Sequence, residues 1–565
     1  MTQKLAILAW LLVIIVAVFV RFYGIKHLPT SLNWDEVSIF VDVSTMVESG
    51  TDMHGNSWLQ AIYPSWGDYK LPGYILAVWG TAQLLGLHQW IVRIPSALAG
   101  LLTVVTGGGI AYSLFSKNNI AKQAAWWSAL VIATSPWDII FSRSGFEAHL
   151  SQALLGISAL LLLNKNQSWM VKLLAVLVGA ASVYTYYSTR FVWPIVFGSW
   201  WLWFSFKWHQ KLNLLETVKQ VGLGLLVPII LFFILLQPLA KSPLYQPSQQ
   251  FRLSTPSILN ETKTVETAKS LRMTTNNSPF SHLFFNQEML RIHQLAKNVV
   301  SHLSLEYLFF NGDQNLRHGT GVHGLFLLVW MPFFCIGIIK TATKYKKAGF
   351  FLGVWTAAAL IPASVPAVVP HALRSLNSLI PLSILIGVGV SATLEVIGCF
   401  RNRIFETKKI AVVITLLAVG MSLFEFMGYY LNRYPITAAE SWSDGYQELA
   451  DRTIYLSYTL SIERVLVHNT DGRLPLRFLA SSFLNSQDGF DTVSGDYLFK
   501  RLGRFYFTGI PTQPELLALQ TPTLLVTHSG MISSYSDQIQ DHIQVIETVR
   551  SSDGQERGTI ALYKP

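Results

Sequence analysis

Apolar runs long enough to cross a lipid bilayer constrain this chain more than any other feature of its sequence. The run "LAILAWLLVIIVAVFV" covers residues 5–20 without one charged residue. A segment in lipid must bond its own backbone polar groups, so such a run forms a helix. The chain is 51% hydrophobic and 13% charged, against about 25% charged in soluble domains. We expect a polytopic helical membrane protein, whose first span is retained because no small-residue cleavage site follows it.

Lysine-rich loops between the runs predict the topology, because Lys and Arg collect on the cytoplasmic side. Residues 71–87 reach only about 25 Å as a helix, short of a ~30 Å hydrocarbon core. If they dip into the outer leaflet, "SKNNIAK", "NKNQS", "FKWHQK", "KTATKYKK" and "FRNRIFETKK" all become cytoplasmic. The net charge of +10 then needs no nucleic acid. This interpretation predicts about eleven spans: 4–21, 90–115, 121–141, 148–163, 169–187, 190–206, 215–237, 322–340, 348–366, 372–396 and 409–429.

Three regions are predicted to lie outside: a first loop at 22–89, a polar loop at 240–321, and the tail. The tail alternates helical stretches with the β-rich runs "RVLVHNT", "PTLLVTHSG", "IQVIETV" and "GTIALYKP", which is typical of a small α/β domain. We therefore predict a transmembrane domain at 1–430 and an extracytoplasmic α/β domain at 431–565. Only two cysteines occur, Cys335 and Cys399, so no disulfide framework or thiol metal site is expected.

With this topology, most unusual polar residues face one side. Charged groups near hydrocarbon are costly and usually face a cavity and one another, and arginine binds phosphate oxygens in a bidentate manner. Such a cavity suits an anionic lipid headgroup beside a hydroxyl or amine nucleophile. Each residue also has a simpler explanation, such as a helix cap at Asn33, a snorkelling Arg93 or a membrane-belt Tyr187. The candidates are Asp35, Glu36, Asp68, Tyr69, Lys70, Arg93, Asp138, Arg143, Glu147, His149, Tyr187, Arg190, Asp313, Arg317, His318, His371 and Arg374.

The ordered motifs "DE", "DYKLPGY", "VRIPSAL", "SPWDIIFSRSGFE", "YTYYSTR" and "PHALR" resemble bacterial members of glycosyltransferase family thirty-nine. These are relatives of the dolichyl-phosphate-mannose protein mannosyltransferases and of the lipid A aminoarabinose transferase. The resemblance covers about residues 5–430. It implies the GT-C fold, juxtamembrane helices in the first outer loop, an extracytoplasmic active site and a polyprenyl-phosphate sugar as donor. It also implies a multi-pass protein of the plasma (inner) membrane.

The resemblance also implies roles for single residues. Asp35 matches the essential aspartate proposed as general base, and Glu36 matches a neighbour that helps to hold the acceptor. Lys70 matches a position that faces the donor phosphate, although Leu71 separates it from Pro72. Arg93 matches the arginine that heads the second span.

These roles predict an inverting glycosyltransferase in which Asp35 deprotonates an acceptor hydroxyl or amine as it attacks the anomeric carbon. The negative charge that develops on the leaving polyprenyl phosphate is stabilised by Lys70 and by arginines among Arg93, Arg143, Arg190 and Arg374. The acceptor is left open among lipid, glycan and protein. A lipid-linked-sugar flippase and an oligosaccharide ligase of the same fold are the alternatives.

The scheme requires no cofactor and assigns no metal ligand. A divalent metal would still find oxygen and nitrogen ligands in Asp35, Glu36, His318 and His371 if their loops converged.

Overall fold

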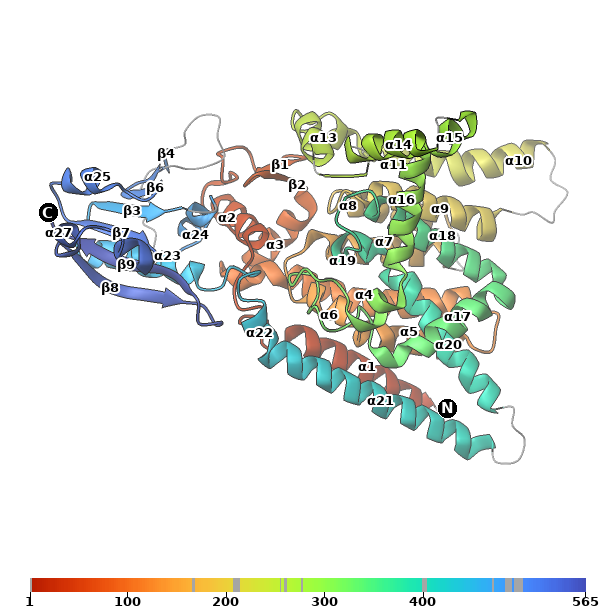
Figure 1. Cartoon of the computed structure of the whole chain (residues 1–565). Helices are drawn as coiled ribbons and strands as arrows, with labels where there is room; N and C mark the ends of the chain where they lie inside the picture. Colours follow the sequence, from red (N-terminus) through yellow and green to blue (C-terminus); the bar gives the residue numbers. More distant parts are fainter. Residues whose placement is uncertain are drawn as a thin grey trace.

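The structure is a computed structural model in which a body of helices carries a β-sheet at one end (Figure 1). The first-loop helices α2 and α3 lie between the helical body and this sheet, whereas the amino terminus lies at the far end of the body. The structure describes residues 3–164, 168–206, 214–254, 256–258, 262–275, 278–398, 404–469, 472–482, 490–491 and 501–565.

The helices of the body follow the apolar runs, and their buried faces form two large hydrophobic clusters. The body consists of α1 (Gln3–Phe22), α4 (Ile94–Leu114), α5 (Ala121–Ala133), α6 (Pro136–Ser142), α7 (Glu147–Leu162), α8 (Trp169–Val183), α9 (Thr189–Trp200), α10 (Leu214–Val221), α11 (Val227–Leu235), α17 (Met331–Thr343), α18 (Lys346–Ala363), α20 (Leu379–Gly398) and α21 (Ile404–Asn432). Short π-helical or 3-10 segments adjoin some of these helices: η2 (Trp201–Ser205) follows α9, η3 (Gly222–Leu226) joins α10 to α11, and η5 (Leu328–Trp330) precedes α17.

Four helices in the described part of the chain are long and apolar enough to cross a bilayer: Gln89–Leu114, Leu214–Leu235, Ala372–Ile397 and Thr407–Asn432. The bent pair α6 and α7 would add a fifth. The count of eleven spans therefore stays a prediction. The predicted span 121–141 is broken in the structure, because Ser135 caps a new helix whose first residue is Pro136, and proline lacks the N–H that would continue α5.

Loops predicted to share the cytoplasmic side do lie together. A pocket of about 700 Å³ is lined by Lys117, Asn164, Ser205 and Lys344–Lys347, which come from four different loops. The grouping agrees with the lysine-based assignment of these loops to one end of the helical body.

The first outer loop folds into its own small structure. It contains α2 (Trp34–Ser49), the hairpin of β1 (Tyr63–Ser65) and β2 (Asp68–Lys70), α3 (Pro72–Leu85) and the 3-10 turn η1 (Gln89–Arg93). At 14 residues, α3 is about 21 Å long, too short to cross a ~30 Å hydrocarbon core. Helix α3 begins against the turn after α8, where the N–H of Gly73 donates to the carbonyl of Tyr184 at 2.8 Å.

The polar region 240–321 is largely helical, which its composition did not predict. Its elements are α12 (Gln237–Ala240), α13 (Tyr245–Ser254), α14 (Thr262–Thr274), α15 (Pro279–Phe284), α16 (Gln287–His302) and η4 (Glu306–Phe310). After a loop, the chain enters η5 and α17. The short α19 (Ala372–Ser375) and η6 (Leu376–Ser378) lead from the loop before them into α20.

After α22 (Tyr434–Thr437), the described residues of the tail form a mixed seven-stranded sheet of order β4-β5-β6-β3-β7-β9-β8. β3 pairs in parallel with β6 and β7, and the other pairings are antiparallel. The four predicted β-rich runs form β3 (Arg464–His468), β7 (Thr523–Thr527), β8 (Ile543–Arg550) and β9 (Glu556–Tyr563). The remaining elements are α23 (Tyr446–Thr459), α24 (Leu474–Leu479), β4 (Phe490–Asp491), β5 (Arg501–Leu502), β6 (Phe505–Thr508), α25 (Gln513–Leu517), α26 (Ser529–Ile532) and α27 (Asp537–Gln540).

Helix α24 joins the tail to the first outer loop. Leu476 and Ala480 belong to the same hydrophobic cluster as α2 and α3. The guanidinium of Arg477 donates to the carbonyl of Leu32 at 2.6 Å, and the indole N–H of Trp66 donates to the carbonyl of Gly472 at 3.0 Å. The first and last parts of the chain therefore pack as one unit beside the helical body.

Two glycines let α17 and α20 approach backbone to backbone. A Cβ on Gly389 would overlap the carbonyl oxygen of Phe333, and a Cβ on Gly337 would overlap that of Leu385. Small residues at such crossings are how membrane helices pack closely.

We predict that Gly389→Ala destabilises the protein by about 1–3 kcal/mol, because a backbone carbonyl must move to admit the methyl group. Thermal unfolding of the purified protein in detergent measures this. Gly353→Ala in α18 is the matched control, since a Cβ there meets no atom within 4 Å. Equal melting temperatures for the two variants would contradict the packing described.

Candidate active site

The adjacent carboxylates Asp35 and Glu36 begin helix α2, and the structure gives them different tasks. The side chain of Asn33 caps α2 by accepting from the N–H groups of Asp35 and Glu36. Glu36 completes a capping box, since its carboxylate accepts from the N–H of Asn33 at 2.9 Å. Such a box satisfies two backbone donors that a helix start leaves without partners. The cap therefore uses Asn33 and Glu36 and leaves the Asp35 carboxylate for other contacts.

Glu36 is also the fully buried centre of a wider network. Its Oε1 accepts from the N–H of Gly145 at 2.7 Å and lies 3.2 Å from Nε of Arg93. The rest of the Arg93 guanidinium donates to the carbonyls of Ile25, Pro29 and Ser31. Both charges hold the first loop against α4 and the α6–α7 turn. The predicted roles of Glu36 in catalysis and Arg93 in phosphate binding stay predictions.

Lys70 stands at the end of β2 and links two carboxylates from different elements. Its Nζ lies 2.9 Å from Oδ1 of Asp35 and 3.2 Å from Oε1 of Glu147, the first residue of α7. The Lys70 side chain is only 4% exposed, and Asp35 is 27% exposed. Nearby carboxylates raise the pKa of Lys70 although its burial opposes this, so the ammonium stays charged.

The second oxygen of Asp35 faces Arg317, whose Nη1 lies 3.6 Å from Oδ2. Arg317 and Arg473 both stack on the ring of Trp34, at 4.1 and 3.9 Å from its centre. Burial alone would raise the pKa of Asp35, but Lys70, Arg317 and Arg473 together lower it below its usual value. Asp35 is therefore an ionised carboxylate, able to accept a proton, within reach of solvent.

Asp35 opens into a cavity of about 270 Å³ between the first loop, α7, α13 and the loop that leads into α19. The lining contains both acidic and basic side chains. The basic groups can bind an anion, and the acidic groups can bind the hydrogen of a nucleophile. Most of its lining is polar: Asp35, Asp68, Tyr69, Lys70, Glu147, Thr185, Tyr186, Tyr187, Arg252, Arg317, His318, His371 and Arg374.

Ten of the predicted site residues line this cavity: Asp35, Asp68, Tyr69, Lys70, Glu147, Tyr187, Arg317, His318, His371 and Arg374. Asp313 lies behind the two histidines, 3.9 Å from each. The convergence joins segments that are as much as 339 positions apart in sequence, from Asp35 to Arg374. The predicted gathering of these residues at one end of the body is therefore what the structure contains.

Two further arginines predicted to bind phosphate lie outside the cavity lining. Arg143 is fully buried, donates to the carbonyls of Val20 and Leu28, and faces the ring of Tyr430. Arg190 donates to Gln249 on α13. The first guanidinium ties α1 to the α6–α7 turn and the second contacts α13, so their phosphate-binding roles stay predictions.

Asp138 and His149 form another internal network. Asp138 pairs with Arg21 of α1, while His149 Nε2 lies 3.0 Å from the other carboxylate oxygen. All three side chains are fully buried. The buried cation that pairs with Asp138 is therefore Arg21 of α1.

Sequence reasoning missed Arg252, Arg473 and Trp34. Arg252 comes from α13 and stacks on Tyr187, 3.7 Å from the ring centre, with Asp68 at 4.0 Å. Nothing in the polar region 240–321 distinguished this arginine from its neighbours. Arg473 belongs to the tail. Its position beside Trp34 could have been predicted only from knowledge that these two distant segments are in contact.

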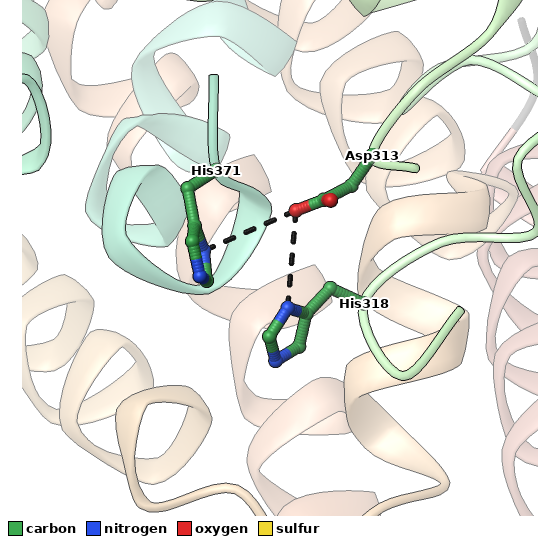
Figure 2. Close-up of side chains that lie close together, drawn as sticks. All are labelled: Asp313, His318 and His371. Carbon is green, nitrogen blue, oxygen red and sulfur yellow. Dashed lines mark ion pairs between the residues drawn. The ribbon is translucent and has the colours of Figure 1, made fainter. Parts of the chain in front are cut away.

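Within the described parts of the chain, one cluster of side chains could hold a metal ion: Asp313, His318 and His371 (Figure 2). One possible ligand atom from each residue lies within 4.8 Å of those of the other two. Burial lowers the pKa of His371 to about 3 and that of His318 well below its usual value, so both imidazoles are neutral, as metal ligands are. The donor set fits a divalent ion. The group differs from the set named from sequence, because Asp313 joins His318 and His371 in it whereas Asp35 and Glu36 do not.

Comparison with known proteins gives structural matches alone. No family model matches the chain, and no curated protein matches it in sequence. ArnT from Cupriavidus metallidurans bound to undecaprenyl phosphate has a TM-score of 0.52 at 13% identity, covering 98% of this chain and 97% of its own. Its apo structure has a TM-score of 0.53 at 14% identity, with coverage of 99% and 98%.

The oligosaccharyltransferase AglB from Archaeoglobus fulgidus is a second kind of neighbour. Its complex with an inhibitory peptide and a dolichol-phosphate has a TM-score of 0.50 at 12% identity, covering 85% of this chain and 64% of AglB. The Archaeoglobus fulgidus oligosaccharyltransferase complex with Zn and sulfate matches with a TM-score of 0.51 at 10% identity, with coverage of 97% and 72%. The likeness shows that this chain shares the fold of ArnT and AglB, which agrees with the fold expected from its sequence.

We predict that Arg93→Met destabilises the protein by about 3–5 kcal/mol, because it leaves the buried Glu36 carboxylate without its cation. Thermal unfolding in detergent measures the loss. In the double variant Glu36→Gln/Arg93→Met no buried charge is left over, so its loss should be smaller than the sum of the two single losses. Strict additivity would show that the two side chains act independently.

Proposed function

We propose that this chain is an inverting glycosyltransferase that moves a sugar from a polyprenyl-phosphate donor to an acceptor hydroxyl or amine, with Asp35 as general base. The observation that carries the proposal is one cavity in which an ionised carboxylate lies between two cations, Lys70 and Arg317. A glycosyl phosphate needs both a base for the incoming nucleophile and positive charge for the leaving group.

Arg252, Arg374 and Lys70 form the proposed phosphate-binding part of the cavity. Arg252 is held by the face of Tyr187, while the Nη1 of Arg374 donates to the carbonyl of Val368 at 3.4 Å. Each guanidinium has further N–H groups for phosphate oxygens, since guanidinium has five donors. Positive charge fixed in advance stabilises the departing polyprenyl phosphate without reorganisation during the reaction.

The proposed reaction is a single displacement. The acceptor O–H or N–H gives its proton to Asp35 as its oxygen or nitrogen bonds to the anomeric carbon. The bond from that carbon to the phosphate oxygen breaks, and its electron pair leaves with polyprenyl phosphate. Attack from the face opposite the leaving group inverts the anomeric centre. Glu147 remains paired with Lys70 and keeps it in place.

The structural neighbours support the donor class. ArnT was solved with undecaprenyl phosphate and AglB with a dolichol-phosphate, which are both long isoprenoid phosphates. Within the proposal, the cavity end of the body and the tail are extracytoplasmic at the inner membrane. The lysine-rich pocket is cytoplasmic, and residues 1–430 and 431–565 are the catalytic and accessory domains of family thirty-nine type.

Asp35→Asn should abolish transfer, because an amide of the same shape cannot take the acceptor proton. Membranes containing the variant are incubated with undecaprenyl phosphate carrying radiolabelled mannose or aminoarabinose, and label in non-donor lipid, glycan and protein is counted. Glu48→Gln is the control, since Glu48 is an exposed carboxylate on the same helix. Wild-type-like transfer by Asp35→Asn, or translocation of donor without any transfer by the wild type, would refute the proposal.

The pH dependence of transfer tests the link between Lys70 and Asp35. Because the pKa of Asp35 lies below its usual value of 3.8, wild-type kcat should show no loss from Asp35 between pH 8 and about pH 5. Lys70→Met removes the strongest influence that lowers this pKa, so the acid limb of its residual activity should move to higher pH. Lys26→Met, an exposed lysine in the same loop, should keep the wild-type profile. An unmoved acid limb in Lys70→Met would exclude this link.

A further inference from the structure

We propose that Asp313, His318 and His371 form a binding site for one divalent transition-metal ion, with Zn²⁺ as the best match. Asp313 and His318 come from the loop between η4 and η5, and His371 directly precedes α19 (Figure 2). The proposal concerns binding at these three side chains, and it holds whether or not the proposed glycosyl transfer is correct.

The two imidazoles are directed at one carboxylate oxygen. Nδ1 of His318 and Nδ1 of His371 each lie 3.9 Å from Oδ2 of Asp313 (Figure 2). This distance is too long for a direct hydrogen bond. Neither Nδ1 atom has a hydrogen-bond partner among the described residues, and the three residues are 3–8% exposed. Two buried nitrogens without partners that face one anionic oxygen indicate a shared cation, because buried polar atoms are otherwise bonded.

Backbone groups hold the carboxylate in this orientation. Oδ1 of Asp313 accepts from the N–H of Asn315 at 2.9 Å, and Oδ2 accepts from the N–H of Ala372 at 2.7 Å. The N–H of His371 donates to Nε2 of His302 at 3.1 Å. Contacts of this kind, beyond the ligands themselves, are what orient metal ligands in proteins.

Two nitrogens and one carboxylate oxygen suit Zn²⁺ better than Mg²⁺ or Ca²⁺, which prefer oxygen ligands throughout. Tetrahedral zinc with bonds of about 2.0–2.1 Å places its ligands about 3.3–3.4 Å apart. The two nitrogen–oxygen distances of 3.9 Å thus need to contract by only about half an ångström.

A metal here would tie the start of α19 to the loop that carries Arg317. Arg317 adjoins His318 in sequence, and Arg374 follows His371 by three positions. Both arginines line the cavity that contains Asp35. The ion would therefore hold two cavity cations in register without contacting the phosphate itself.

The test is metal content of the full chain in detergent. The protein is stripped with EDTA, reloaded with ZnCl₂, freed of unbound metal by gel filtration, and measured by inductively coupled plasma mass spectrometry. We expect about one zinc per wild-type chain and at least a fivefold lower content in His318→Ala, His371→Ala and Asp313→Asn. His293→Ala, an exposed histidine on α16, should retain the wild-type content.

Thermal shift and cobalt spectra provide readouts that do not depend on activity. Zinc should raise the melting temperature of stripped wild type and of His293→Ala, but not of the three site variants. Co²⁺ should give visible absorption bands of a nitrogen- and oxygen-ligated tetrahedral site in wild type and in His293→Ala, but not in the three site variants. If His318→Ala does not fold, His318→Gln and Asp313→Asn carry the test. Zinc content below one tenth per reloaded wild-type chain, or equal content in wild type and folded site variants, would overturn the proposal.

Discussion

The buried carboxylate of Glu36 is the constraint on which the arrangement of the cavity depends. It accepts from the N–H groups of Asn33 and Gly145 and pairs with Arg93. A Cβ at position 145 would lie 3.0 Å from Cγ of Glu36 and 2.7 Å from a methyl group of Val92, so glycine is what permits this approach. Through these contacts one side chain sets the direction in which α2 begins, and thereby where Asp35 points.

Adjacent residues of the same type thus do opposite things. A helix rotates by about 100° per residue, so when Glu36 faces the protein interior, Asp35 cannot. Asp35 meets Lys70 and Arg317 in a cavity that solvent reaches, whereas Glu36 is sealed from solvent. Two consecutive residues therefore have different roles, because the helix directs their side chains to different sides: Asp35 is the ionised carboxylate of the cavity, and Glu36 is a buried structural contact.

The sequence predicted which residues gather at one end of the helical body, because this depends only on the order and direction of the helices. Lysine-rich loops assigned Asp35, Lys70, Glu147, His371 and Arg374 to one end of the body, and the structure brings them together. The pattern could not tell which charges bond to backbone carbonyls. Arg93 and Arg143 look no different in sequence from Arg374, yet they satisfy carbonyls of the first loop and α1. Such pairings depend on tertiary approach, which no local periodicity encodes.

Secondary structure shows the same limit. The four β-rich runs form β3, β7, β8 and β9 as predicted, whereas the polar helices α13–α16 and the short strand β6 were missed. Polar helices stabilised by tertiary contacts carry a weak pattern. Pro136 is an instructive case, since it divides a continuous apolar run into α5 and α6 and allows the turn that positions Glu147.

The joint between α24 and the first loop has a consequence for how the protein is made. Arg477 bonds to Leu32, 445 positions earlier, and Arg473 stacks on Trp34, so residues translated much later complete the surroundings of the first outer loop. During synthesis the early helices enter the bilayer long before these partners leave the ribosome. The nascent chain therefore holds Asp35 in an unfinished setting until α24 has been translated.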